Sequence, residues 1–143
     1  MAFEDSILIQ ASPEVLFALT QDYGRRLSWD SFLKAADLVG GAPEAGLGVR
    51  ALCVARSGLA METEYVSFDA PRVAAVKMTR GPWFIDSFAG SWRFIAEAPD
   101  HTRVSFKYHV RGRPAAISGL LTRVFARDTR KRLEALKRAV EGA

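Results

Sequence analysis

The sequence has few of the residues that build metal centres and disulfides: its 143 residues include one cysteine, Cys53, and two histidines. A single cysteine excludes an internal disulfide, and with two histidines it gives no recognisable zinc-ligand spacing. Neither His101 nor His109 stands at a spacing from Cys53 that suggests a nucleophile and its base, so we expect Cys53 to be a small buried strand residue. The sequence therefore predicts no metal and no cofactor.

Long hydrophobic runs are also missing, since none approaches the roughly 18 apolar residues of a membrane-spanning helix. The opening stretch MAFEDSILIQ holds acids where a signal peptide needs bases, so a cytoplasmic location is expected. Hydrophobic residues make up 49% and charged residues 25% of the chain, as in a globular protein. Without a linker, repeat or low-complexity segment, we expect a single domain over residues 1–143.

The net charge of +4 comes from the last segment, because from Ala115 onward seven Lys or Arg face three acids. Such a basic face is most simply solvated, although anionic lipid headgroups or RNA could also attract it. No aromatic residues are interleaved with these bases, which disfavours RNA, and no DNA binding is expected. An anionic membrane surface is the partner that this charge favours. The bases considered are Arg123, Arg127, Arg130, Lys131, Lys137 and Arg138.

The pattern of apolar residues predicts a strand, two short helices, six further antiparallel strands and a long helix. The first strand is Phe3 to Gln10, and Ser12 can cap a helix whose first residue is Pro13. A second short helical piece follows a break at Gly24. Turn signals separate the later strands, which we place at 34–39, 47–56, 60–68, 72–79, 84–96 and 102–111. The long helix spans 115–141, and its apolar stripe has a period near 3.6: Ile117, Leu121, Phe125, Leu133, Leu136 and Val140.

This order is typical of an α+β protein in which a curved seven-stranded sheet wraps around the long helix. Several short stretches also resemble one family: IQASPEVLF at 9–17, Trp29, GLG at 46–48, FDAPR at 68–72, GSWRF at 90–94, TRV at 102–104 and LEALKRAVE at 133–141. The chain is similar to the START and birch-pollen-allergen-like helix-grip superfamily (SRPBCC), in particular to its bacterial polyketide cyclase or dehydrase-like subgroup. The resemblance implies a hydrophobic cavity between sheet and helix, which various members use for lipids, polyketides, hormones or quinones. It supplies no common catalytic set.

Alternation along 84–96 and 102–111 predicts how these two strands pair. Gly90 would then face Tyr108, which leaves a gap in the wall where a ligand could lie, although a side chain from the long helix could fill it. Asp86 would lie opposite Gly112 near the rim. The other expected pairs are Phe94 with Val104, Trp92 with Phe106, and Phe88 with Val110.

Asp86 has two interpretations. If it points inward, desolvation by its apolar neighbours would raise its pKa and make it an acid, a base or a polar anchor for a ligand. If it lies at the open end, it would be hydrated or paired with Arg80, Arg111 or Arg113, and a bulge in this strand would turn it outward.

The strand 60–68 also allows two orientations. With Met61, Thr63, Tyr65 and Ser67 inward, both glutamates meet water, which we favour because burying unpaired carboxylates is costly. The opposite orientation would bring Glu64 and Asp86 to one face as a carboxylate pair.

The sequence thus favours binding or carriage of an apolar small molecule such as a lipid, polyketide or quinone-like compound. One alternative is a cyclase or dehydratase that uses Asp86, assisted by Glu64 or Tyr108. Another is an RNA- or ribosome-interacting protein that uses the basic helix. Trp83 is a candidate exposed contact for a membrane or a partner. The predicted cavity residues are Trp29, Phe32, Met61, Tyr65, Met78, Phe84, Asp86, Phe88, Gly90, Trp92, Tyr108, Leu121 and Phe125.

Overall fold

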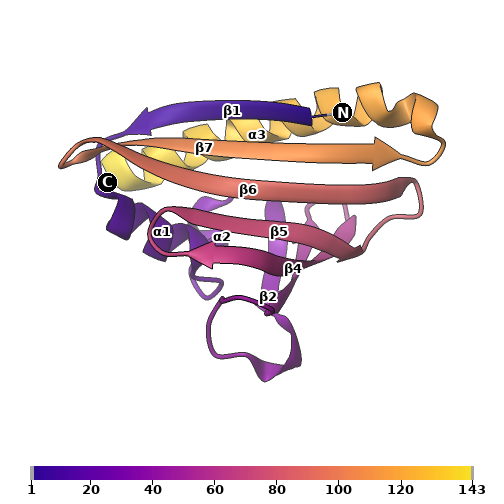
Figure 1. The fold of residues 1–143 in the computed structure, drawn as a ribbon, viewed down its shortest axis with the longest axis horizontal. Helices are drawn as coiled ribbons and strands as arrows, with labels where there is room; N and C mark the ends of the chain where they lie inside the picture. The colour runs from indigo at the N-terminus through magenta and orange to yellow at the C-terminus, as the bar shows by residue number, and fades with distance from the viewer. Residues whose placement is uncertain (1, 143) are drawn as a thin grey trace.

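A curved antiparallel sheet and a long helix on its concave side form the two layers of the protein (Figure 1). The computed structural model describes residues 2–142. Its strands are β1 (Ala2–Ile9), β2 (Leu33–Leu38), β3 (Arg50–Ala55), β4 (Ala60–Asp69), β5 (Val73–Arg80), β6 (Ile85–Ala98) and β7 (His101–Gly112). Its helices are α1 (Pro13–Gln21), α2 (Arg26–Trp29) and α3 (Ser118–Glu141), with short 3-10 turns η1 (Val39–Gly41) and η2 (Ala115–Ile117).

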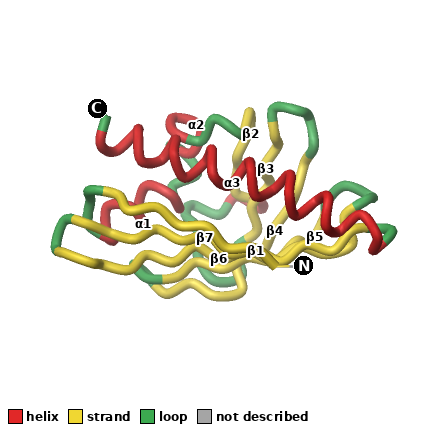
Figure 2. Tube along the Cα trace, turned by 90° about the horizontal axis from the view of Figure 1, so that it is seen from above, coloured by secondary structure: helices red, strands yellow, loops and turns green. Residues whose placement is uncertain are grey.

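The strands form one sheet in the order β1-β7-β6-β5-β4-β3-β2. The predicted α+β helix-grip architecture, with its seven strands and its element order, is confirmed. Figure 2 shows the sheet curling upward at the end that holds β2 and β3, while α3 runs across the hollow. The space between the two layers is where a binding site can form.

Helix α1 begins at the residue that the sequence predicts. The Ser12 hydroxyl accepts a hydrogen bond from the Val15 N–H at 3.3 Å, and Pro13 is the first helical residue. This cap fixes the start of the helix that carries Leu16 and Phe17 into the core.

The β6–β7 hairpin has the predicted register over most of its length. Phe94 pairs with Val104, Trp92 with Phe106, Gly90 with Tyr108 and Phe88 with Val110. The register then shifts, because Ile85 pairs with Gly112 and Ser87 with Arg111. The extra residue on β6 is Asp86, so the predicted pairing of Asp86 with Gly112 is wrong by one residue.

Helix α3 is attached to the sheet by its apolar stripe and by polar contacts to β1. Leu133 and Leu136 are fully buried. Arg130 donates to the Ser6 carbonyl at 3.2 Å, and Lys137 donates to the Leu8 carbonyl at 2.9 Å. Two of the six bases assigned to a solvated face therefore hold the helix on the sheet, which corrects that expectation.

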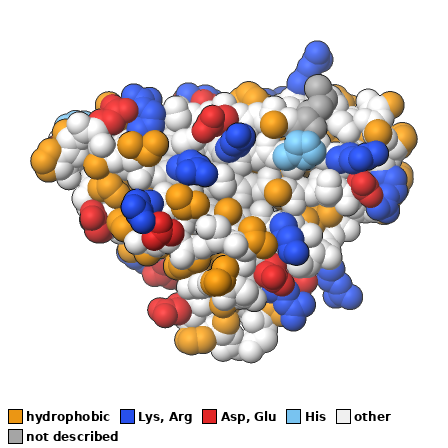
Figure 3. All heavy atoms as spheres, in the orientation of Figure 1, with side chains coloured by type: hydrophobic (Ala, Val, Ile, Leu, Met, Phe, Trp, Pro, Cys, Tyr) orange, Lys and Arg blue, Asp and Glu red, His pale blue; other side chains and the backbone are white. Residues whose placement is uncertain are grey.

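The opposite face of the sheet carries charges of both signs interspersed among apolar side chains (Figure 3). None of the helices within residues 2–142 is both long and apolar enough to cross a membrane.

Candidate functional site

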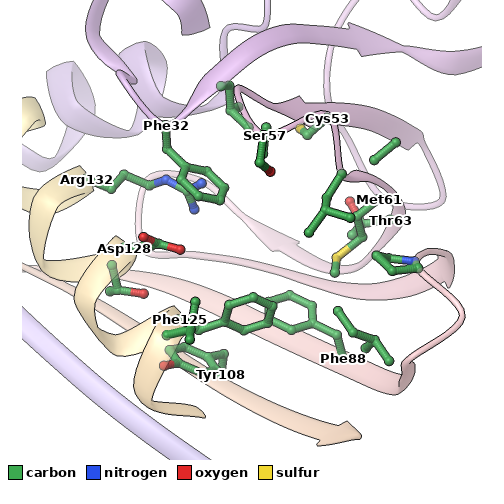
Figure 4. A pocket seen from close by; sticks show the side chains of 18 of the residues that line it. Phe32, Cys53, Ser57, Met61, Thr63, Phe88, Tyr108, Phe125, Asp128 and Arg132 are labelled. Atoms are coloured by element: carbon green, nitrogen blue, oxygen red, sulfur yellow. The ribbon is translucent and has the colours of Figure 1, made fainter. Parts of the chain in front are cut away.

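A cavity of about 500 Å³ lies between α3 and the concave side of the sheet. Helix α3 supplies one wall, β6 and β7 a second, and β3 and β4 with the segment around α2 a third. Figure 4 shows Phe88, Phe125 and Tyr108 along one side of this space, with Phe32 and Arg132 on another. The size falls within the range of about 300–1,000 Å³ that is usual for small-molecule sites.

Aromatic rings make up much of the wall. The Phe88 ring lies 5.6 Å from the Phe125 ring and 6.0 Å from the Tyr108 ring, measured between centroids. Trp92 and Phe106 lie 5.0 Å apart and continue the wall. Rings held against one another in this way present a fixed apolar surface to whatever enters.

Eight of the predicted cavity residues line this space: Phe32, Met61, Phe84, Phe88, Trp92, Tyr108, Leu121 and Phe125. Five do not: Trp29, Tyr65, Met78, Asp86 and Gly90. Trp29 is buried behind the wall, where its ring lies 6.3 Å from that of Trp92. Met78 packs against the apolar core.

The orientation of β4 follows the favoured prediction up to Tyr65. Met61 and Thr63 line the cavity, and Tyr65 is buried, so Glu64 lies on the opposite face. A register shift between Tyr65 and Ser67 then brings Phe68 inward in place of Ser67. The carboxylate pair of Glu64 and Asp86 is therefore not formed.

Glu62 departs from the expectation that both glutamates meet water. It is only 9% exposed, accepts a hydrogen bond from the Thr79 hydroxyl at 2.8 Å, and lies 3.7 Å from Arg50. Its charge is thus satisfied on the side of the sheet away from the cavity.

Asp86 is exposed and paired with arginines, as in the second of its two interpretations, so its place among the predicted cavity residues is wrong. The bulge turns it outward, where it accepts a hydrogen bond from Arg113 at 2.7 Å and lies 3.7 Å from Arg111. The hydrogen bond from Arg113 lowers the pKa of Asp86, which keeps the carboxyl ionised. This environment gives no support to a catalytic acid.

The gap expected at Gly90 is filled. A Cβ atom at this position would lie 2.8 Å from Cζ of Phe106, so a ring from the neighbouring strand occupies the place where a ligand was predicted. Tyr108, opposite Gly90, reaches the cavity with its ring, but its hydroxyl donates to the Thr122 carbonyl at 2.8 Å. The hydroxyl proton of Tyr108 is therefore used in a hydrogen bond to the backbone of α3.

One end of the cavity is polar because a buried carboxylate binds two arginines. Asp30 is 1% exposed, and its Oδ2 lies 2.9 Å from Nε of Arg26 and 3.1 Å from Nε of Arg132. Burial alone would raise the pKa of Asp30, but the charges of Arg132 and Arg26 outweigh it and leave this pKa below its usual value. The ion triad is therefore fully charged at neutral pH.

A chain of hydrogen bonds lies beside this triad. The Tyr65 hydroxyl donates to Oε1 of Gln21 at 2.6 Å, and the Tyr23 and Tyr65 hydroxyls lie 2.9 Å apart. Because the proton of Tyr65 is committed to Gln21, Tyr23 must be the donor between the two tyrosines. Gln21 in turn donates to Thr20, which donates to the Phe17 carbonyl. Only Tyr23 of the two tyrosines lines the cavity, and burial raises the pKa of both.

The polar end was not found from the sequence, although signals for it exist. Arg26 and Asp30 stand four residues apart, which places them on one face of a helical turn. Asp128 and Arg132 stand seven residues after Leu121 and Phe125, so they continue the face that lines the cavity. The sequence pattern assigned Arg127 to the solvated face and gave Arg132 and Asp128 no role, although all three line the cavity.

Within residues 2–142 no three His, Cys, Asp or Glu side chains are grouped as a metal site would need. Cys53 lines the cavity, and burial raises the pKa of its thiol, which makes it a poor nucleophile at neutral pH.

Residues 1–141 match the family model described as polyketide cyclase / dehydrase and lipid transport. The chain belongs to this polyketide cyclase / dehydrase and lipid transport family. Its membership agrees with the helix-grip architecture and with the resemblance to the START and birch-pollen-allergen-like superfamily. No curated protein matches the sequence.

Solved structures show the same fold at low identity. The Zhui aromatase/cyclase from a Streptomyces species has a TM-score of 0.84 at 14% identity, with 99% of this chain and 93% of that chain covered. A START superfamily protein from Mycobacterium smegmatis has a TM-score of 0.69 at 12% identity, with 94% and 98% covered.

The di-domain ARO/CYC protein BexL, from the BE-7585A biosynthetic pathway, is similar with a TM-score of 0.82 at 17% identity. The match covers 99% of this chain but only 46% of BexL, so this chain spans about half the length of that protein. At these identities the structural similarity shows a shared fold and nothing about activity.

Proposed function

We propose that the protein binds and carries a hydrophobic small molecule, such as a lipid, a polyketide or a quinone-like compound, in the cavity between α3 and the sheet. The observation that carries this proposal is the cavity of about 500 Å³ with a largely apolar wall that includes several aromatic rings. Exposed apolar surface of this kind is costly in water, and an apolar ligand would remove it from solvent. Membership of a family described by lipid transport as well as cyclase activity supports the same view.

A blocking substitution tests this proposal. Thr63 points into the cavity from β4, so Thr63→Phe would fill part of the space with a ring. We expect a neutral fluorescent dye, phenylnaphthylamine, to bind the unmodified protein and to bind Thr63→Phe about tenfold more weakly. The measurement is dye fluorescence as a function of protein concentration.

Val66→Phe is the matched control, because Val66 lies on the same strand but is 46% exposed. It should leave dye binding unchanged. If the unmodified protein does not bind the dye, or if both variants bind it as the unmodified protein does, the cavity is not a binding site. Mass spectrometry of the purified protein under native conditions would identify a ligand that it retains.

A cyclase or dehydratase is the second function that the family description allows. The three residues first assigned to that chemistry do not support it in this structure: Asp86 is at the surface, Glu64 faces away from the cavity, and the Tyr108 proton is held by Thr122. Asp128 is the carboxylate that borders the cavity. We therefore place carriage before catalysis.

The basic residues of α3 give weaker support for a binding partner than the cavity gives for a ligand. Arg130 and Lys137 are engaged with β1, while Arg123 and Arg127 are exposed. Trp83 is 77% exposed next to Phe84, which lines the cavity. Exchange of the ligand at an anionic membrane surface is compatible with these positions and stays a prediction, as does the less favoured contact with RNA.

A further inference from the structure

The cavity is largely apolar, yet charged side chains gather at its polar end. Three arginines line the cavity, namely Arg26, Arg127 and Arg132. Two carboxylates oppose them: Asp30, which binds Arg26 and Arg132, and Asp128, which lines the wall. Arg127 is exposed to solvent, so Arg26 and Arg132 are the cations held at the inner end.

Asp30 cannot balance both arginines that it contacts. Its Oδ2 accepts a hydrogen bond from Nε of Arg26 at 2.9 Å and lies 3.1 Å from Nε of Arg132, which makes no hydrogen bond to a described residue. Its Oδ1 accepts the backbone N–H of Phe32 at 3.1 Å. Arg26 uses its remaining donors further, since Nη1 donates to the Thr20 carbonyl at 3.2 Å. The charge of Arg132 is therefore the less completely paired of the two.

Arg132 presents this charge to the cavity. Its guanidinium lies 4.9 Å from the centre of the Phe32 ring, and its side chain is 16% exposed. Within residues 2–142, its two terminal nitrogens make no hydrogen bond. Figure 4 shows the guanidinium beside Phe32 at the edge of the pocket. The two terminal nitrogens carry four N–H donors on a planar group that lies against Asp30 and the Phe32 ring, which is the geometry that binds a carboxylate in bidentate fashion.

Asp128 would oppose an anion at the same wall, so its position matters. It stands one helical turn before Arg132, and no ion pair joins the two within the described chain. Asp128 also borders a neighbouring hollow of about 310 Å³, together with Arg56 and Lys131. Asp128 therefore borders both the cavity and this hollow, and among the residues that the structure describes its carboxylate leaves the terminal nitrogens of Arg132 without a hydrogen bond.

We infer that the ligand is an apolar molecule with a carboxylate, whose acidic group binds Arg132 while its apolar body lies against Phe88 and Phe125. This inference rests on the proposed function, because it names the class of molecule that the same cavity would carry. A neutral hydrocarbon would leave the terminal nitrogens of Arg132 without an acceptor, whereas a carboxylate would accept hydrogen bonds from them.

A pair of ligands that differ only in the head group tests the inference. Decanoic acid and decanol are each titrated against the protein loaded with neutral phenylnaphthylamine, at neutral pH and low salt. We expect the acid to displace the dye with an affinity about tenfold higher than that of the alcohol. Arg132→Gln should remove this preference by weakening the acid alone, and Arg132→Lys should restore part of it.

Arg130→Gln is the matched control. Arg130 stands two residues away on α3 and also lies near an aspartate, Asp5, but it contacts β1 and does not line the cavity. It should leave the preference for the acid intact.

Equal binding of acid and alcohol by the unmodified protein would overturn the inference while leaving the proposed carriage standing. Loss of both ligands in Arg132→Gln, with the fold intact, would also overturn it, since a structural role would explain that result. If the dye and both ligands fail to bind the unmodified protein, the proposed function itself is wrong. If Arg132→Gln does not fold, the comparison of acid with alcohol on the unmodified protein still decides the question.

Discussion

Replacing Asp30 by asparagine should destabilise the protein more than any other single change of a carboxylate at this site. The substitution keeps the shape and the acceptor for the Phe32 N–H, but it removes the charge between Arg26 and Arg132, whose side chains are 6% and 16% exposed. Removing one partner of a buried ion pair leaves an uncompensated charge and costs about 3–5 kcal/mol. For a protein of this size each kcal/mol lowers the melting temperature by about 3 °C, so we expect a decrease of about 10–15 °C.

Thermal unfolding followed by circular dichroism measures this change, and Asp86→Asn is the matched control. Asp86 also contacts two arginines, but all three side chains are well exposed, so its loss should leave the melting temperature nearly unchanged. Similar melting temperatures for Asp30→Asn and Asp86→Asn would refute the reasoning, because they would show that burial of the triad does not govern its energy.

Two further predictions concern stability. Because the pKa of Asp30 is lowered in the folded protein, its contribution to stability is present above the unfolded value of about 3.8 and is lost as the pH falls through the folded value. Acid titration of the unmodified protein should therefore show a loss of stability below about pH 4, and this loss should be smaller in Asp30→Asn. Identical acid profiles of the two proteins would contradict this. Gly90→Ala should lower the free energy of unfolding by about 1–3 kcal/mol and weaken dye binding, because the new methyl group pushes the Phe106 ring toward the cavity. Denaturant unfolding measures the first effect, and an unchanged unfolding midpoint would show that the ring moves aside at no cost.

The sequence predicted the architecture because its signals were local and repeated. Alternating apolar residues on β6 and β7 set the pairing of Trp92 with Phe106, and one slipped residue would have reversed every side chain. Alternation alone did not decide the position of Asp86, since a bulge is not visible in a pattern of period two; here it turns Asp86 outward and Ile85 inward while the rest of the strand keeps its faces.

The polar end of the cavity was missed for a different reason. Arg132 lies on the same face of α3 as the apolar stripe, but an arginine on a helix is usually solvated. Its position in the cavity wall depends on Asp30, which is about a hundred residues distant in the sequence. Contacts between such distant residues come from the tertiary fold alone. The cavity wall was therefore partly predictable, whereas the charge within it was not.

The hydrogen bonds that begin at Tyr23 have a consequence for acid–base chemistry. Each proton from Tyr23 through Tyr65 and Gln21 to Thr20 is donated toward the protein interior, and the Phe17 carbonyl accepts the last one. Tyr23 therefore offers lone pairs, and no spare proton, to a molecule in the cavity. Reversing this direction would require the amide of Gln21 to turn over, because an amide oxygen cannot donate. With this direction of donation, the Tyr23 hydroxyl could accept a hydrogen bond from a ligand hydroxyl but could not donate one to a ligand carbonyl, so the chain is not a route for delivering a proton.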